Sequence, residues 1–539
     1  MKWRNLIIVA ACVVLANVLA HVWIVRWDLT DDRHYSLSEA TKDLLRNTDE
    51  PIEVTLFLHG DLNAGFRRLQ KATEETIEEM DVYAKFKITK AEDSKKAESL
   101  GLHPIVIHER QQDGKTAQTT VYPYAMMQYK GKRAPIALLK NTRGLSGEEN
   151  LNASIENMEF AFAEALHLLQ QTETPRVAIL EGHGEPDEAH TYDLMTALNR
   201  YYQVDRGQLN NDAHILDAYK AVLVLDPQTA FNDQERFVLD QYIMRGGAVL
   251  WALNGVRFSE QVLQKEGFTP IIALDLGLTD MLFRYGVRIN PALVQDVQCL
   301  PIPVNVSDDP QQPNLQPMPW TYAPLLLTSQ GSPITRNLGQ VSSTFVSPID
   351  AVGGEDGIEK RVLLALITAT RLTCTPGEVE LSDINPDMST FQYHYVQVAV
   401  SLEGEFQSAF AHRMVPEGIT NSGAIIKQGT KTRQVLIACG SIADNEVQQG
   451  QALPMGYDRY SGMQFSNRDM VVNAVLWLTD ADGLISLREK SVALRLLNDK
   501  RAHDERMKVQ WISTVSPIAI LALIGGVVMI IRRKKYQNV

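Results

Sequence analysis

The residues with the clearest chemical potential lie in one short loop, EGHGE, at residues 181–185. A short apolar run, RVAIL, leads into the loop, and acidic residues follow it. In an α/β protein, a loop at the carboxyl end of a strand borders the crevice where ligands bind. The loop is therefore the first candidate for an active site, and the surrounding sequence must distinguish catalysis from binding.

A metal site is one chemistry that these residues offer. The possible ligands are His183, Glu185, Asp187 and His190. Their spacing does not match the helical H-E-x-x-H arrangement, because Pro186 interrupts it and His183 lies in a turn. The pattern therefore predicts no metal site.

Acyl-transfer chemistry would need a nucleophile at a turn between a strand and a helix. The strand ends that follow the loop read LDP, with Asp226, and LNG, with Asn254, and neither offers a serine or a cysteine. One similar turn, CGS, contains Cys439, but a cysteine directly before glycine at a strand end is more typical of a core position. We therefore expect no catalytic residue and no cofactor.

Binding without catalysis explains the loop more simply. Gly182 and Gly184 permit positive φ and a close approach of the backbone. Glu181 and Glu185 are expected to cap the next helix favourably, and His183 is expected to orient the loop or meet a ligand. The candidate ligand or partner residues are Glu181, Gly182, His183, Gly184, Glu185, Asp226 and Asn254.

Alternating strands and helices must position this loop. From residue 176 the chain reads RVAIL, EAHTYDLMTALNRYY, AVLVLD, NDQERFVLDQYIMRGG and AVLWAL, which predicts strand, helix, strand, helix and strand. Continuous apolar strands between helices indicate a parallel sheet covered on both faces. Residues 173–300 therefore predict the first part of a Rossmann-like α/β domain. Residues 431–483, with the strand RQVLIACG and a helix at about 469–478, complete it.

Residues 301–430 predict a Pro-rich and β-rich insertion in this larger domain. Prolines crowd residues 301–324, which favours irregular structure there. The pieces RVLLALITAT and FQYHYVQVAVSLEGEFQSAF then predict strands.

Residues 26–172 predict a small extracytoplasmic α+β domain. A first helix at about 39–46 has Ser36 or Ser38 as its cap. The strands IEVTLFL and YAKFKIT flank a charged amphipathic helix, and HPIVIH predicts another strand. VYPYAMMQYKGKRAPIALL predicts a hairpin that turns at KGK, and one helix over 148–171 follows. This order suits a thioredoxin-like topology without the redox cysteines of that fold.

Both ends of the chain carry apolar segments, residues 6–25 and 511–531, that are long enough to cross the ~30 Å hydrocarbon core. Lys2 and Arg4 precede the first segment, and RRKK begins the tail at residues 532–539. Because basic flanks stay in the cytoplasm, both ends are predicted to be cytoplasmic. The prediction is a two-pass membrane protein with residues 26–510 on the outer face of the membrane.

Two features near these spans refine the topology. Residues 1–5 form the cytoplasmic N-terminus, and residues 484–510 predict a charged juxtamembrane helix. The VLA that ends at Ala20 resembles a signal-peptidase site, so a cleaved signal peptide is the alternative to a first span. The apolar run continues past Ala20, which favours a retained anchor.

Composition limits the possible functions further. The chain has 539 residues, 22% charged and 45% hydrophobic, which indicates several globular domains. A net charge of −13 argues against a nucleic-acid partner. The 4 cysteines form no C-x-x-C pair, which argues against a zinc ribbon or a dithiol redox site.

Several phrases in order resemble the gliding-motility ABC-transporter auxiliary proteins (the GldG family). They include DLTDDRHYSLSEATKDLL, GEENLNASIENME, VAILEGHGEP, VLVLDPQTAFNDQERFVLDQYIMRGGAVLWALNG, GLTDMLFRYGVRINPALVQDV, VAVSLEGEFQSAF and GLISLREKSVALRLLNDKR. The shared order runs from the first apolar segment to the last, and it is more specific than any single phrase.

The resemblance implies a non-catalytic auxiliary subunit of an ABC-2-type transport system. It implies a multi-span permease as partner, a cytoplasmic P-loop ATPase reached through that permease, and contact with membrane lipid. It also implies a degenerate glutamine-amidotransferase-like α/β domain without the catalytic cysteine. No G-x-x-x-x-G-K-[ST] motif occurs in the chain, so ATP hydrolysis would come from a partner. The alternative is an envelope-facing enzyme, hydrolase or amidotransferase-like, that uses the 181–185 loop.

Overall fold

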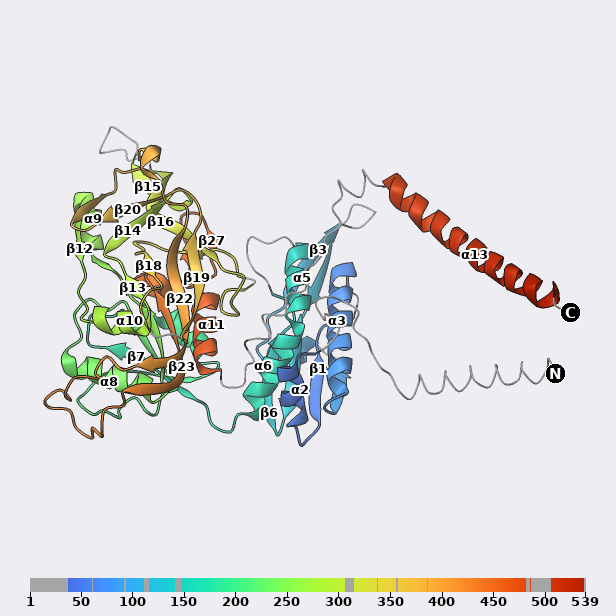
Figure 1. The fold of residues 1–539 in the computed structure, drawn as a ribbon, viewed down its shortest axis with the longest axis horizontal. Coiled ribbons are helices and arrows are strands. Elements are labelled where there is room, and N and C mark those ends of the chain that lie inside the picture. The colour runs from blue at the N-terminus through green and yellow to red at the C-terminus, as the bar shows by residue number, and fades with distance from the viewer. Residues whose placement is uncertain are drawn as a thin grey trace. The chain divides into compact units, whose positions relative to one another are not determined.

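The computed structural model describes the following residues: 37–60, 62–91, 94–110, 116–140, 147–305, 315–336, 338–354, 357–384, 386–480, 485 and 506–537. The chain forms two compact units, Met1–Ser491 and Val492–Val539. Together they give a mixed α/β protein with large sheets (Figure 1).

The first part of the larger unit contains a four-stranded sheet in the order β2-β1-β5-β6. Its strands are β1 (Ile52–Leu56), β2 (Phe86–Lys90), β5 (Tyr124–Tyr129) and β6 (Lys132–Ala137). The parallel pair β1–β2 is joined through α3 (Ala64–Asp81), while β5 and β6 form the predicted hairpin. Before them, α2 (Glu39–Arg46) begins at its cap Ser38, as the sequence predicts.

The long helix predicted over residues 148–171 is two helices, α5 (Gly147–Glu156) and α6 (Met158–Gln170). They meet at Asn157, which precedes α6 without a side-chain cap. The continuous apolar spacing therefore hid a break at this asparagine. The other elements of this part are α4 (Ser94–Ser99) and a hairpin of β3 (Ile105–Arg110) and β4 (Thr116–Val121).

Five parallel strands form one half of a ten-stranded sheet, in the order β8-β7-β9-β10-β23. They are β7 (Arg176–Glu181), β8 (Gln203–Gln208), β9 (Ala221–Leu225), β10 (Ala248–Ala252) and β23 (Gln428–Ile437). Numbered along the chain, this order is 2-1-3-4-5, so the direction of winding reverses between β7 and β9. Ligand crevices in open α/β sheets lie at such a reversal, outside the carboxyl ends of the strands.

Successive residues of a strand point to opposite faces of the sheet, so apolar side chains of these strands need cover on both faces. Helices cover both faces of this half. Val177 and Ile179 of β7 share a buried cluster with α7 (Tyr192–Leu198) and α11 (Asn467–Thr479). Ala178 and Leu180 share another with α8 (Asp233–Met244) and α10 (Thr279–Tyr285). Figure 1 shows α8 and α10 on one side of the sheet and α11 on the other. The core is thus two apolar layers on one sheet.

The strands after residue 298 extend the same sheet in antiparallel fashion. They are β15 (Cys299–Asn305), β16 (Leu315–Thr328), β19 (Glu359–Leu366) and β22 (Val396–Gln407). The expected irregular structure of the Pro-rich segment is wrong where the chain is described, because β15 and β16 pair there. Pro301 lies opposite Pro319, and Pro303 opposite Pro317. Alternate residues of an antiparallel strand point their N–H away from the partner, so facing prolines need cost no ladder bond.

Smaller elements complete this unit. The helices are α9 (Glu260–Glu266), η1 (Met388–Thr390) and η2 (Gly440–Ala443). The strands are β11 (Val256–Arg257), β12 (Phe268–Ala273), β13 (Arg288–Ile289), β14 (Ala292–Asp296), β17 (Val341–Ser342), β18 (Ile349–Asp350), β20 (Thr370–Cys374), β21 (Gly377–Glu380), β24 (Val447–Gln448), β25 (Gln451–Ala452), β26 (Tyr457–Asp458) and β27 (Met463–Gln464).

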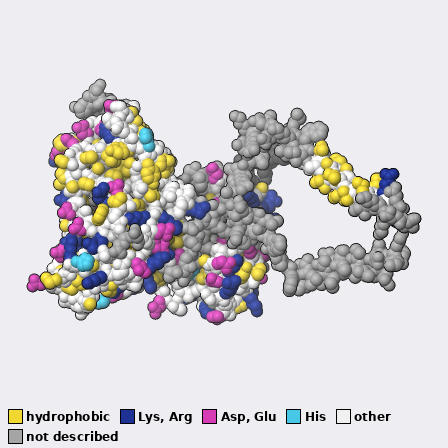
Figure 2. Space-filling view, viewed as in Figure 1, with side chains coloured by type: hydrophobic (Ala, Val, Ile, Leu, Met, Phe, Trp, Pro, Cys, Tyr) yellow, Lys and Arg dark blue, Asp and Glu magenta, His cyan; other side chains and the backbone are white. Residues whose placement is uncertain are grey.

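The smaller unit contains α13 (Arg506–Gln537). Its segment Ser513–Ile530, with a mean hydropathy of 2.2, is long and apolar enough to cross a membrane, and it is the single such helix within the described residues. Figure 2 shows the apolar surface of this helix, and in the sequence the basic residues Arg532 to Lys535 follow the apolar segment. The predicted first span at residues 6–25 lies outside the described residues, as does most of the segment at 484–510.

Candidate functional site

The loops after β7 and β9 meet at the carboxyl edge of the parallel strands. The carbonyl oxygen of His183 accepts hydrogen bonds from the backbone N–H of Gln228 (2.7 Å) and of Thr229 (3.0 Å). Gly182 has a φ of 115°, a conformation that favours glycine and lets the loop turn back here. The EGHGE loop therefore borders the reversal point of the sheet.

His183 is buried, with 5% of its surface exposed, and lies between two carboxylates. Its Nε2 lies 3.1 Å from Glu235 Oε2, and its Nδ1 lies 3.3 Å from Glu185 Oε1. The ring stacks on Phe231 with 3.8 Å between centroids. Glu235 and Asn232 also form the capping box of α8. His183 consequently joins the loop to the start of that helix.

Asp226 follows β9 directly and has a φ of 47°, which is uncommon for a residue other than glycine. Its Oδ1 accepts a hydrogen bond from Asn254 Nδ2 (2.6 Å), and Asn254 Oδ1 accepts one from the N–H of Gly440 (2.9 Å). A Cβ atom on Gly440 would lie 1.9 Å from Asp226 Oδ1. The loops after β9, β10 and β23 thus contact one another, and this close approach requires a residue without a side chain at position 440.

The charges of three acidic residues in this region bear on one another. Glu260, at the start of α9, acts on Asp226 and on Asp444, which follows η2, and Asp226 also acts on Asp444. The pKa of Asp226 is raised to about 7, mainly by burial and also by the nearby charges of Glu260 and Glu185, while hydrogen bonds with Gln228 and Asn254 act to lower it. Burial, then Asp226 and Glu260, raise the pKa of Asp444 well above its usual value. Burial likewise raises the pKa of Glu260. The surroundings of these three carboxyl groups therefore disfavour their charged forms.

Cys439 lies two residues after the last parallel strand, β23, directly before η2, and is completely buried. Burial is the main cause that raises the pKa of its thiol to about 12. The thiolate is the nucleophilic form of cysteine, so this side chain is held in its unreactive state. The expected core role of Cys439 fits this environment.

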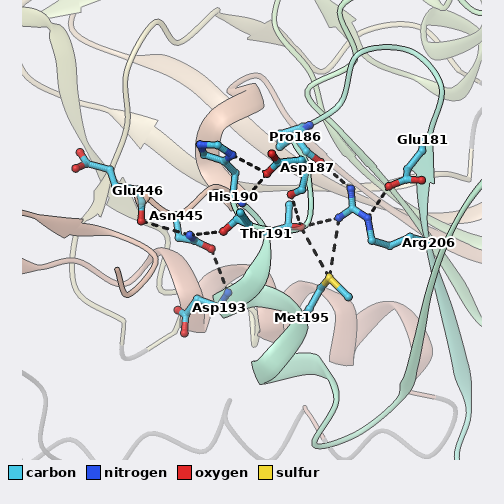
Figure 3. A network of polar contacts seen from close by, with 11 residues as sticks. Glu181, Pro186, Asp187, His190, Thr191, Asp193, Met195, Arg206, Asn445 and Glu446 are labelled. Atoms are coloured by element: carbon cyan, nitrogen blue, oxygen red, sulfur yellow. Dashed lines mark hydrogen bonds and ion pairs between the residues drawn. The ribbon is translucent and has the colours of Figure 1, made fainter. Parts of the chain in front are cut away.

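Glu181 faces a different network from the rest of its loop. Its Oε1 accepts from Arg206 Nε (2.6 Å), and Arg206 also donates to Thr191 Oγ1 (2.6 Å) and to the carbonyl oxygen of Pro186 (2.7 Å) (Figure 3). Arg206 comes from β8, so it holds the whole turn after β7 from the neighbouring strand. Figure 3 shows its guanidinium between Glu181 and Thr191.

The expectation that Glu181 and Glu185 cap the next helix is wrong. Glu181 pairs with Arg206, and Glu185 Oε2 accepts from the N–H of His183 (2.6 Å) in its own loop. The predicted helix over EAHTYDLMTALNRYY is also shorter than expected, since α7 begins only at Tyr192. The intervening turns place both glutamates too far along the chain to reach the first turn of the helix.

Asn445 fixes the far side of the same loop. It is buried, with 2% of its surface exposed. Its Nδ2 donates to the carbonyl oxygen of Ala189 (2.9 Å), and its Oδ1 accepts from the N–H of Asp193 (3.1 Å) (Figure 3). The segment after β23 therefore positions the segment after β7.

The four residues weighed as metal ligands divide into two pairs. His183 lies beside Glu185, whereas His190 Nδ1 lies 2.7 Å from Asp187 Oδ1 on an exposed turn. In the described part of the chain, no three His, Cys, Asp or Glu side chains are placed to hold a metal ion. The structure gives this loop no assembled metal centre within that part.

The candidate residues from the sequence thus lie at one sheet edge in two groups, around His183 and around Asp226, with Glu181 apart from both. Reasoning from strand ends did not find Glu235, Gly440 or Asp444. Glu235 had a usable signal, since asparagine followed three residues later by glutamate is a helix-start pattern.

Comparison with known proteins bears mainly on the larger α/β part. Residues 174–474, more than half of the chain, match the family model described as an ABC-type uncharacterized transport system. Residues 31–128 match a domain of unknown function. No curated protein matches the chain.

Among solved structures, the N-terminal domain of mmIFT52 is 14% identical, with a TM-score of 0.32, and the match covers 57% of this chain and 98% of that one. PurLQS from Thermotoga maritima is 10% identical, with a TM-score of 0.22 and coverage of 57% and 100%. The exo-beta-1,4-mannosidase Op5Man5 from Opitutaceae bacterium strain TAV5 is 12% identical, with a TM-score of 0.19 and coverage of 55% and 35%. None of these similarities is high enough to assign a fold. On the family match, this chain belongs to the ABC-type uncharacterized transport system family, an auxiliary component of ABC-type transport systems.

Proposed function

We propose that this chain is a non-catalytic, membrane-anchored auxiliary subunit of an ABC-2-type transport system. The observation that carries the proposal is the family match over residues 174–474 in a chain that also has a candidate membrane helix, Ser513–Ile530. The α/β region binds cargo or an envelope partner, and the spans associate with a multi-span permease. A cytoplasmic P-loop ATPase acts through that permease.

The absence of catalysis is supported by the strand ends. Asp226 and Asn254 occupy the positions where an acyl-transfer enzyme would carry serine or cysteine. Cys439, the nearest thiol along the edge, is buried, and its pKa is raised to about 12. We therefore infer a degenerate amidotransferase-like, Rossmann-like domain that has kept a ligand crevice without the nucleophile.

The proposed location is the bacterial inner membrane, with both termini cytoplasmic and the bulk of the chain periplasmic. The basic residues around Arg533, directly after the apolar part of α13, support a cytoplasmic C-terminus. We propose the domain boundaries that the sequence predicts, with a thioredoxin-like part over residues 26–172. The resemblance of ordered phrases to the GldG family supports the same role.

Co-purification tests this proposal. The tagged full-length chain, extracted from membranes in mild detergent, is expected to bring with it a multi-span permease and a P-loop ATPase, identified by mass spectrometry. An unrelated single-span protein with the same tag is the control. Recovery of the chain alone, or with the same proteins as the control, would contradict the proposal.

The alternative function is an envelope-facing hydrolase or amidotransferase-like enzyme that uses the 181–185 loop. The buried His183 between Glu185 and Glu235 is the observation that favours it. This alternative predicts that His183→Gln abolishes turnover while the complex still assembles. The auxiliary role predicts no turnover in either protein.

A further inference from the structure

The position of His183 between two carboxylates bears on how many protons its ring carries. Its Nε2 lies 3.1 Å from Glu235 Oε2, and its Nδ1 lies 3.3 Å from Glu185 Oε1. A neutral imidazole has one N–H and presents a lone pair on its other nitrogen, whereas an imidazolium has an N–H on both nitrogens. A neutral ring would therefore turn a lone pair toward one of the two carboxylates. The protonated ring presents a donor to both.

Two buried atoms on the Glu185 side of the ring lack the hydrogen bond that a second proton would supply. His183 Nδ1 and Glu185 Oε1 are both buried, and neither has a hydrogen-bond partner among the described residues. The Glu185 side chain is 2% exposed, and its other oxygen, Oε2, accepts from the backbone N–H of His183 (2.6 Å). A buried carboxylate oxygen without a donor is destabilising. A proton on Nδ1 would bring both a donor and a positive charge to this oxygen.

The helix α8 also presents an acidic group to the ring. Glu235 Oε2 accepts from the backbone N–H of Asn232 (2.8 Å), so the cap of the helix fixes the position of this carboxylate. The next residue, Arg236, forms an ion pair with Asp233 instead. The apolar Phe231 stacks on the ring, with 3.8 Å between centroids. On this side the ring therefore meets negative charge and an apolar surface.

The loop after β9 and the strand β11 bring one acidic and one basic residue to the same region. The charge of Glu185 acts on Asp226. Arg257 donates to the carbonyl oxygen of Gln228 (2.9 Å), whose N–H donates to the carbonyl oxygen of His183 (2.7 Å). The basic side chain is thus joined to the backbone of the loop, while both ion-pair contacts of the ring are to carboxylates.

The ring joins a glycine-rich turn to a helix. Gly182 and Gly184 have φ values of 115° and 86°. Glycine enters this region without steric cost, so other backbone conformations are open to the turn. The His183 ring reaches from this turn to Glu235 at the start of α8. Its charge therefore decides how firmly the turn is held against the helix.

We propose that His183 is a pH-sensitive switch that holds residues 182–185 against the start of α8. The protonated ring donates to Glu235 and to Glu185, and the loss of one proton leaves a lone pair facing a carboxylate, which releases the turn. Two carboxylates favour the protonated ring in the folded chain, so this contact stabilises the fold at low pH and is lost as the pH rises. The inference does not depend on the proposed function.

The first test measures the protonation of the ring. The full-length protein in detergent, labelled with ¹⁵N at histidine, is studied by NMR at about pH 7.5, roughly one unit above the ordinary histidine pKa of about 6.5. The loss of signals in His183→Gln identifies those of His183. We expect protons on both ring nitrogens of His183. A neutral ring at this pH would overturn the inference.

The second test measures how firmly the turn is held. Hydrogen–deuterium exchange with mass spectrometry gives the protection of residues 182–185 at about pH 6 and about pH 9, corrected for the intrinsic pH dependence of exchange. We expect protection in the wild type to be at least about tenfold lower at the higher pH, and His183→Gln to show low protection at both. His412→Gln, which changes an exposed histidine, is the matched control and should behave as the wild type.

A second variant covers the case in which His183→Gln does not fold. Glu235→Gln removes one negative charge and keeps a side chain that can complete the capping box, so the loss of protection should begin at a lower pH than in the wild type. Equal wild-type protection at both pH values would overturn the inference, as would a pH dependence that neither variant changes. An equal loss of protection in β9 would also overturn it, because the whole sheet would then respond to pH.

Discussion

Three features of Asp226 each cost folding free energy. Its backbone is left-handed, at a φ of 47°, and such strain costs on the order of 1–3 kcal/mol. Its carboxyl is largely desolvated and faces other acidic groups. Natural proteins retain such local conflicts mainly at functional sites. The cost of this residue is therefore the clearest residue-scale sign of function at the sheet edge.

The raised pKa of Asp226 gives the protein a specific pH dependence. The pKa of Asp226 is about 7 in the folded chain, against an ordinary value of 3.8. Between these values the folded state binds more protons, so Asp226 makes stability fall as pH rises from about 4 to about 7. We expect Asp226→Asn to remove this loss. Its melting temperature should exceed that of the wild type at pH 8, by the equivalent of a few kcal/mol at most, and match it near pH 4.

Melting curves of both proteins at several pH values test this expectation. The same curves for Asp49→Asn are the control, since Asp49 is an exposed surface group. An equal pH dependence in wild type and Asp226→Asn would show that Asp226 titrates normally.

Gly440 is predicted to tolerate no side chain. Its added Cβ would lie 1.9 Å from Asp226 Oδ1 and 2.7 Å from Asn254 Nδ2, so these side chains must rearrange. We expect Gly440→Ala to destabilise the protein by at least about 1–3 kcal/mol, the usual cost of overpacking. Gly423→Ala, with nothing within 4 Å of its added Cβ, is expected to change stability by less than about 0.5 kcal/mol. Chemical denaturation measures both, and equal stabilities would contradict the packing described here.

Strand-end reasoning located His183, Asp226 and Asn254 at one sheet edge, because parallel strands bring their carboxyl ends together. It could not locate Asp444 or Gly440. Their places depend on how the segment after β23 folds back, which is a tertiary contact without a local pattern. Glu181 was included as a candidate because of its position in the loop. It instead forms an ion pair with Arg206, which lies on a strand that was not predicted.

At the scale of elements, the turn after β7 depends on one arginine from β8. Arg206, with a 12% exposed side chain, donates to Glu181, Thr191 and the carbonyl of Pro186. Arg206→Ala leaves these acceptors without their donor. We expect a loss of about 1–3 kcal/mol in the free energy of unfolding and faster proteolysis within residues 182–191.

Arg46→Ala is the control for this change. Arg46 has a 55% exposed side chain and pairs with Asp43 one turn away, so its loss should cost less than about 0.5 kcal/mol. Limited proteolysis with mass spectrometry locates the cleavage. An Arg206→Ala protein as stable and as resistant as Arg46→Ala would mean that the turn is held by other contacts.

The sequence predicts those helices and strands whose patterns lie within a short continuous segment, and it misses those that depend on long-range pairing. The apolar strands β9 and β10, and the capped helix α8, were predicted because their patterns are continuous. The edge strand β8, with the sequence QVDRGQ, was missed because it has little apolar content. The Pro-rich strands β15 and β16 were missed because their facing prolines conceal a long-range pairing.

At the scale of the whole molecule, we assign different roles to two parts of the chain. This assignment uses the family match and the candidate membrane span. In the proposed function, the candidate membrane helix α13 is the attachment to the membrane, and the α/β part is the surface for a ligand or partner. The sequence has no G-x-x-x-x-G-K-[ST] motif, and the proposed function assigns ATP hydrolysis to a partner subunit.

Photo-crosslinking from α13 in native membranes tests most directly the proposed association with a permease. A photoreactive amino acid at Leu521 or Ile524, within the apolar segment, is activated by light, and the adducts are identified by mass spectrometry. The same samples kept in the dark are the control. We expect an adduct with a multi-span permease from at least one of these two positions. Adducts with lipid alone, or with proteins unrelated to transport, would contradict it.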